Sequence, residues 1–107
     1  MAIKAIIFDM DDVLCTYDVG QRISHLATLS GASEKAVRTA IWEGDFLDRA
    51  DRGAFSADEF LAEFGLRLGY QLTLAEWVAA RKGSMTPDPS MLRLVESLGQ
   101  HYRLALL

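Results

Sequence analysis

The chain has 107 residues, half of them hydrophobic, and a formal net charge of −4, a size and composition that suit one globular domain. Its Lys and Arg residues are scattered and form no basic stripe, so the sequence argues against a nucleic-acid backbone as the main partner. No apolar run is long enough to span a membrane, and acidic residues interrupt the region where a signal peptide would be apolar, so we expect a cytoplasmic chain without membrane partners.

The chain begins with a hydrophobic stretch, Ile-Lys-Ala-Ile-Ile-Phe, at residues 3–8. It is rich in β-branched residues and does not alternate, which predicts a strand covered on both faces in a parallel sheet. Five segments with apolar residues three or four apart follow, and these predict helices over residues 18–30, 33–44, 45–52, 57–68 and 74–82. Capping boxes, Ser56 with Glu59 and Thr73 with Glu76, mark the starts of the last two.

Residues 83–90, Gly-Ser-Met-Thr-Pro-Asp-Pro-Ser, hold both prolines and are predicted to be a linker. A further helix is expected to begin at Pro89 and to end at Gly99, and residues 102–107 are the second strand candidate. Two parallel strands need a connection of only about a dozen residues, far fewer than lie between these two. We therefore predict an α/β fold with a helical subdomain inserted at the carboxyl end of the first strand, where open α/β sheets bind ligands.

Three carboxylates, Asp9, Asp11 and Asp12, follow the first strand within four positions. Residues two apart in an extended segment point to the same side, so Asp9 and Asp11 can face one site. Such a pair can hold Mg²⁺, or it can divide the roles of nucleophile and proton donor. The alternative is that these acids only form a turn or cap a helix. A calcium loop is excluded, since Leu14 stands where that loop needs glycine and Gly20 where it needs glutamate.

The segment KAIIFDMDDVL resembles the first motif of the haloacid-dehalogenase-like (HAD) superfamily, a hydrophobic strand followed by Asp-x-Asp-x-(Val/Thr)-Leu. The segments FSADEFLAEFGLRLG and PDPSMLRLVESLGQHYRLALL resemble the cap and the return to the core in subfamily I phosphatases. The resemblance implies a partial Rossmann-like core, with two parallel strands and a helix, at residues 1–15 and 85–107. It also implies a helical C1 cap at residues 16–84.

The resemblance further implies a Mg²⁺-dependent phosphohydrolase that acts on a small phosphorylated metabolite. Asp9 would be the nucleophile and form an aspartyl-phosphate, because a carboxylate needs no activating base. Asp11 would protonate the leaving alcohol and then deprotonate the hydrolytic water. The Asp9 side chain and the Asp11 backbone carbonyl would bind Mg²⁺. Asp12, where many such phosphatases have glycine, would be structural in the turn.

Three elements of the family pattern are not found in these 107 residues: the Ser or Thr after the second strand, a later Lys, and a further acidic cluster. The chain thus resembles the amino-terminal part of a HAD phosphatase, and we expect it to be inactive alone. An uncovered apolar sheet edge would invite pairing with another copy into a homo-oligomer.

The rival hypothesis is a non-enzymatic truncated module that self-associates or binds a partner. A 2-haloacid dehalogenase, which shares Asp9 but needs no metal, fits less well because the Asp11 acid is typical of phosphatases.

A few further residues carry expectations about burial. Cys15, the only cysteine, is expected to be a small buried hydrophobic residue. Trp42 and Trp77 lie beside aliphatic residues on predicted helix faces and are expected in the core. Arg49 and Arg52, among neighbouring aspartates, are interpreted first as a solvated charged face and second as a phosphate-recognising loop.

Overall fold

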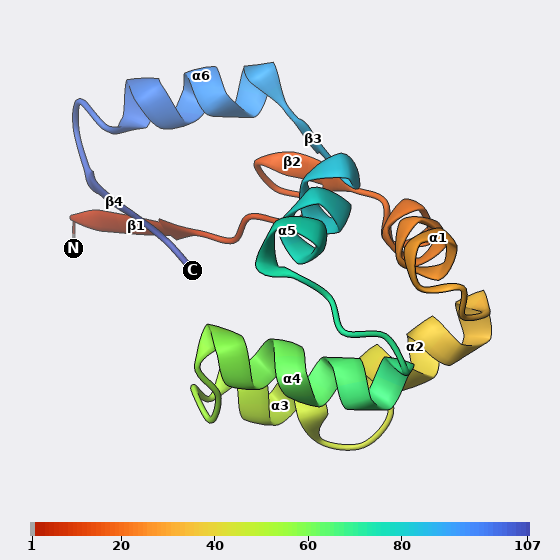
Figure 1. The fold of residues 1–107 in the computed structure, drawn as a ribbon. Coiled ribbons are helices and arrows are strands. Elements are labelled where there is room, and N and C mark those ends of the chain that lie inside the picture. Colours follow the sequence, from red (N-terminus) through yellow and green to blue (C-terminus); the bar gives the residue numbers. More distant parts are fainter. Residues whose placement is uncertain (1) are drawn as a thin grey trace. The chain divides into compact units, whose positions relative to one another are not determined.

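The computed structural model describes residues 2–107, which contain six helices and four short strands (Figure 1). The chain divides into two compact units. The first comprises the residues up to Asp18 together with Met85–Leu107, and the second comprises Val19–Ser84. The predicted α/β fold class is confirmed, because a parallel strand pair occurs together with the helices.

The first unit contains a two-stranded parallel sheet. Strand β1 (Ala5–Phe8) pairs with β4 (Arg103–Leu106), and the register runs from Ala5 opposite Arg103 to Phe8 opposite Leu106. Helix α6 (Pro89–Leu98) precedes β4 in the chain, as Figure 1 shows. Both predicted strands, at residues 3–8 and 102–107, are confirmed, and so is the helix predicted to begin at Pro89.

The expectation that the first strand is covered on both faces is wrong for the described chain. Ile6 and Phe8 are half-buried, but Ile7 between them is 68% exposed. Helix α6 has no fully buried residue, and its Leu92 and Leu94 are exposed. Two strands and one helix provide apolar cover for one face of the sheet only, so side chains that alternate along β1 have different environments.

A second strand pair was not predicted from the sequence. Strand β2 (Cys15–Tyr17) pairs antiparallel with β3 (Met85–Pro87), within the residues predicted to be a linker. Three residues are too few to show an alternating pattern, and the two strands lie far apart in the sequence. Pro87 ends β3, a position in which the missing N–H of proline is tolerated. Cys15 is buried, as predicted.

The second unit is entirely helical in its regular structure. Its five predicted helices are confirmed and are α1 (Val19–Ser30), α2 (Glu34–Trp42), α3 (Phe46–Asp51), α4 (Ala57–Leu68) and α5 (Leu74–Gly83). Both predicted capping boxes are formed, and they fix the first turns of α4 and α5. Helix α4 ends at Gly69, which has the left-handed backbone (φ 76°) that glycine adopts without a steric cost. No helix within residues 2–107 combines the length and the hydrophobicity needed to cross a bilayer.

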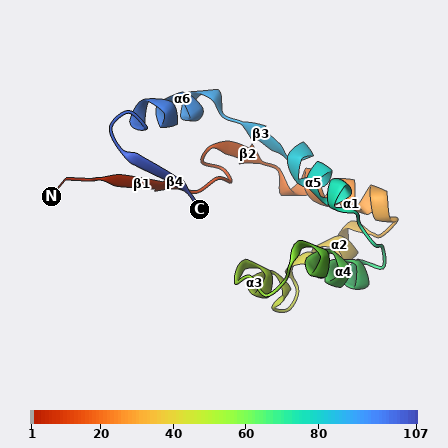
Figure 2. The same cartoon turned by 60° about the vertical axis from the view of Figure 1, so that its left-hand side comes forward.

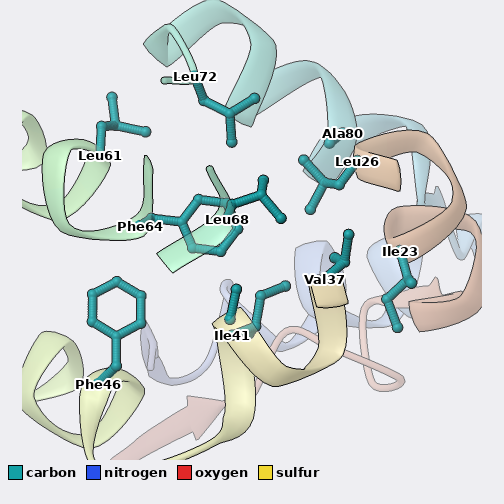
Figure 3. Packing of buried hydrophobic residues seen from close by; sticks show 11 residues of the cluster. Ile23, Leu26, Val37, Ile41, Phe46, Leu61, Phe64, Leu68, Leu72 and Ala80 are labelled. Atoms are coloured by element: carbon teal, nitrogen blue, oxygen red, sulfur yellow. The ribbon is translucent and has the colours of Figure 1, made fainter. Parts of the chain in front are cut away.

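One hydrophobic core holds the second unit together (Figure 3). Helices α3 and α4 lie side by side in both Figure 1 and Figure 2, and Phe46 of α3 stacks on Phe60 of α4 with ring centroids 4.9 Å apart. Trp77 is half-buried and packs edge-on against Phe60, as expected for a core residue. Trp42 is 43% exposed, so the prediction that it lies in the core is wrong. It is the last residue of α2, where an amphipathic helix can turn a large side chain to solvent.

Candidate active-site turn

The candidate site is the turn that leaves β1, residues 9–14. Its backbone folds back on itself, because the carbonyl oxygen of Met10 accepts hydrogen bonds from the N–H groups of Val13 (3.2 Å) and Leu14 (3.0 Å). Asp11 also forms an isolated parallel bridge with Cys15. The turn is therefore short and tightly hydrogen-bonded, and it carries all three predicted carboxylates.

Asp9 comes directly after β1 and is exposed. Its Oδ1 accepts a hydrogen bond from the N–H of Met10 at 2.8 Å. This local bond is the kind that a turn-forming aspartate makes, and it engages one carboxylate oxygen. In the described chain no further hydrogen bond reaches the Asp9 side chain, so Oδ2 keeps its capacity to bind a cation or to attack an electrophile.

Asp11 follows two positions later and is half-buried. The structure therefore places the two predicted catalytic residues in one turn and in different degrees of contact with solvent.

Asp12 has the structural role that was predicted for it. Its φ of 60° is in the left-handed region, and it is the one non-glycine residue with a positive φ among residues 2–107. Its Oδ1 accepts a hydrogen bond from the N–H of Tyr17 at 2.9 Å. Aspartate tolerates this backbone region better than most residues because its side chain bonds locally. Asp12 thereby fastens the turn to β2.

Asp88 is a further carboxylate in the same unit, and its oxygen is used for helix capping. Its Oδ1 accepts hydrogen bonds from the hydroxyl group of Ser90 (2.7 Å) and from the N–H groups of Ser90 (3.0 Å) and Met91 (3.2 Å). The Ser90 hydroxyl, followed by the Met91 N–H, lowers the pKa of Asp88 below its ordinary value of 3.8. The N–H of Asp88 donates to the carbonyl oxygen of Leu14 at 2.9 Å, which ties the start of α6 to the candidate turn.

The capacity of the turn for a metal ion is limited. Residues 2–107 contain no group of three or more His, Cys, Asp or Glu side chains placed to hold a metal. Mg²⁺ requires fewer protein ligands than this, since it commonly binds one or two carboxylates and fills its other positions with water and phosphate oxygens. The donor set of Asp9 and Asp11 thus fits part of a Mg²⁺ site.

No protein-family model matches the sequence, and no curated protein sequence matches it. Solved structures do match its fold. A predicted HAD-like family hydrolase from Porphyromonas gingivalis is 22% identical, with a TM-score of 0.78, over 98% of this chain and 50% of the other. A HAD family enzyme from Bacteroides thetaiotaomicron in complex with magnesium and inorganic phosphate is 19% identical, with a TM-score of 0.74, over 99% of this chain and 52% of the other.

A second structure of the Bacteroides thetaiotaomicron enzyme is 19% identical, with a TM-score of 0.76. The match covers 100% of this chain and 53% of the other. The chain thus spans about half the length of the solved structures that it matches, which agrees with the expected resemblance to a part of a HAD protein. At these identities the likeness concerns the fold. The chain has the HAD-like fold, in a portion about half as long as the solved HAD structures.

Proposed function

We propose that these 107 residues are part of a Mg²⁺-dependent phosphohydrolase that acts on a small phosphorylated metabolite. The observation that carries the proposal is the position of Asp9 and Asp11 in the turn that leaves β1 of a HAD-like fold. In open α/β sheets the carboxyl ends of the strands form the ligand site. The magnesium and phosphate bound to the Bacteroides thetaiotaomicron enzyme support the same chemistry.

In the proposed reaction Asp9 is the nucleophile. One of its carboxylate oxygens attacks phosphorus, the bond from phosphorus to the alcohol oxygen of the substrate breaks, and an aspartyl-phosphate forms. The Asp11 carboxyl group gives its proton to the leaving alcohol. Asp11, now ionised, takes a proton from a water molecule that attacks the same phosphorus, and inorganic phosphate leaves Asp9 as a carboxylate again.

The Asp9 side chain and the Asp11 backbone carbonyl are the groups that would hold Mg²⁺. The ion would neutralise charge where an anionic nucleophile meets an anionic phosphoryl group. The bond from Met10 N–H to Asp9 Oδ1 keeps one oxygen of the nucleophile oriented, which leaves Oδ2 for the ion or for phosphorus. Asp12 holds the turn in shape through Tyr17 and takes no part in the chemistry.

We assign the first unit to a partial HAD-type core and the second unit to a helical C1 cap. The expected boundaries were residues 1–15 and 85–107 for the core and 16–84 for the cap. The contacts divide the chain after Asp18 and after Ser84. The hydroxyl, lysine and acidic cluster that stabilise charge in HAD phosphatases are not found in the sequence, so the 107-residue chain alone should be inactive.

Release of phosphate from p-nitrophenyl phosphate tests the proposal, with the 107-residue chain and a longer form of the protein assayed in parallel. In the longer form, Asp9→Asn should abolish turnover and Asp11→Asn should lower it about a hundredfold to ten-thousandfold. Asp12→Asn is the matched control, because it removes the same charge from the same turn and keeps the oxygen that accepts the Tyr17 N–H. Equal activities of the Asp9→Asn and Asp12→Asn variants would refute the role of Asp9.

A non-enzymatic, self-associating module is the second candidate, and one observation favours it. Large apolar side chains on and beside the sheet are exposed, namely Ile3 (69%), Ile7 (68%), Leu106 (58%) and Leu107 (89%). A strand with exposed apolar side chains and an unpaired edge readily pairs with another chain. This candidate predicts assembly without phosphatase activity.

A further inference from the structure

A pocket of about 240 Å³ lies within the second unit, where α3, α4 and α5 come together. Most of its lining residues are aromatic or aliphatic, and Ser56 is the one that carries a hydroxyl group. Its main lining residues are Phe55, Ser56, Phe60, Leu61, Leu74 and Trp77. None of them belongs to the turn of Asp9 and Asp11.

The aromatic walls of this pocket are held in place by rings outside its lining. Phe46 is fully buried and lies 5.6 Å from Phe55 and 4.9 Å from Phe60, measured between ring centroids. Phe64, also fully buried, packs against Trp77 at 5.1 Å with the ring planes at 67°. Closing the pocket by turning one of these rings would break an aromatic contact. The cavity is thus preformed, as small-molecule sites usually are.

Cations also hold two of the pocket's rings. The guanidinium carbon of Arg22 lies 4.6 Å from the centroid of the Trp77 ring, and that of Arg49 lies 4.9 Å from the centroid of Phe55. Cation–π contacts of this length orient a ring and leave its edge available to a ligand. The interpretation of Arg49 as part of a purely solvated face is therefore incomplete, since it packs on an aromatic wall.

The size and the polarity of the pocket define what fits it. The pocket is open to solvent, and its volume of about 240 Å³ is large enough for a six-membered ring with a small substituent. The Oγ of Ser56 accepts the N–H of Glu59 at 3.2 Å, and the hydroxyl hydrogen remains available as a donor. An arene offers its edges and faces to Phe55, Phe60 and Trp77 in the tilted arrangements that aromatic rings prefer.

We propose that this pocket binds a small neutral aromatic compound that carries one hydrogen-bond acceptor oxygen. The ring lies against the aromatic walls, and the oxygen accepts the hydroxyl hydrogen of Ser56. Acetophenone has this composition and serves as the probe. Cyclohexyl methyl ketone has the same carbonyl group and a ring of similar size without π electrons, so it serves as the matched control.

The chain offers an internal reference for the experiment, because it has two tryptophans and only Trp77 lines the pocket. Acetophenone is titrated into the ¹⁵N-labelled 107-residue chain, and the two indole N–H signals are followed by NMR after assignment with Trp42→Phe. The Trp77 signal should move and saturate with a dissociation constant of roughly millimolar size, as expected for so small a ligand. The Trp42 signal should stay in place, and cyclohexyl methyl ketone should bind several-fold more weakly.

Two variants test the proposed contacts. Ser56→Asp keeps a side-chain acceptor at the N-cap of α4 but removes the donor, so it should weaken acetophenone binding about tenfold with the fold intact. Phe55→Leu keeps an apolar side chain and removes one aromatic wall, so it should weaken acetophenone but not the aliphatic ketone. Leu92→Ala in α6 is a control that should change neither.

Four results would overturn the proposal. They are a parallel, unsaturable shift of both indole signals, equal affinity for the two ketones, unchanged binding by the Ser56→Asp variant, and a Trp77 signal that moves on simple dilution of the protein. The last result would mean that a second copy of the chain fills the pocket. Because all readouts are binding signals of the second unit, they do not depend on phosphatase activity.

Discussion

Replacing Asp12 separates two contributions to the stability of the turn formed by residues 9–14. The first is the cost of a left-handed backbone, since φ is 60° at this position, and the second is the hydrogen bond from Tyr17 N–H to Asp12 Oδ1 at 2.9 Å. An ordinary residue in this region loses about 1 kcal/mol or more relative to glycine, and aspartate or asparagine recovers part of this by local bonding. A hydrogen bond of this kind contributes about 1 kcal/mol net.

Three substitutions then give three different results. Asp12→Ala loses the hydrogen bond and keeps the steric cost of a positive φ, so it should destabilise the turn by about 1 kcal/mol. Asp12→Gly loses the same bond but removes the steric cost, so the two changes of about 1 kcal/mol nearly cancel. Asp12→Asn keeps both the acceptor oxygen and the tolerance of positive φ, and it should change stability by less than about 0.5 kcal/mol.

Amide hydrogen exchange of Val13 and Leu14 is the assay, because both N–H groups donate to the carbonyl oxygen of Met10 inside the turn. A loss of about 1 kcal/mol should speed their exchange roughly fivefold in the Asp12→Ala variant if they exchange by local opening. Exchange in the Gly and Asn variants should stay close to that of the unmodified chain. Equal acceleration in the Ala and Gly variants would refute the steric contribution, and no acceleration in either would refute the role of the hydrogen bond.

Two further predictions concern the two units separately. Ile7→Lys places a charge on the exposed face of β1 and should lower self-association of the 107-residue chain, as measured by sedimentation. Leu66→Lys, at a residue of α4 that is 81% exposed, is the control. Equal effects of the two substitutions on self-association would argue against assembly through the sheet. The pKa of Glu76 is held below its ordinary value of 4.5, first by the Thr73 N–H and then by the Tyr70 hydroxyl. The unfolded chain therefore binds protons more readily at this residue, and stability that is present above pH 4.5 is lost as the pH falls through the lower, folded pKa. Glu76→Gln cannot titrate, so its urea midpoint should fall less on acidification than that of the unmodified chain, and parallel curves would contradict this.

The helices and the motif could be predicted from the sequence because their causes are local. Ser56 with Glu59 and Thr73 with Glu76 are each three residues apart, and such caps form from neighbouring groups alone. The arrangement of the carboxylates after a hydrophobic strand was likewise visible in the order of residues. Catalysis, by contrast, depends on where side chains from distant parts of a chain converge, which the order of residues alone does not give.

The sequence by itself therefore determined the six helices, the parallel strand pair, and the turn that carries Asp9, Asp11 and Asp12. Only the tertiary structure decided features that arise between distant residues. Thr16 pairs with Thr86 in a ribbon too short to leave a pattern, and Gly65 lies so near Gln71 that an added Cβ would be 2.6 Å from its Oε1. The solvent exposure of the Trp42 and Ile7 side chains was likewise decided only by the tertiary structure. Burial and close approach are properties of the packed chain, because neither depends on the nature of one residue and its immediate neighbours alone.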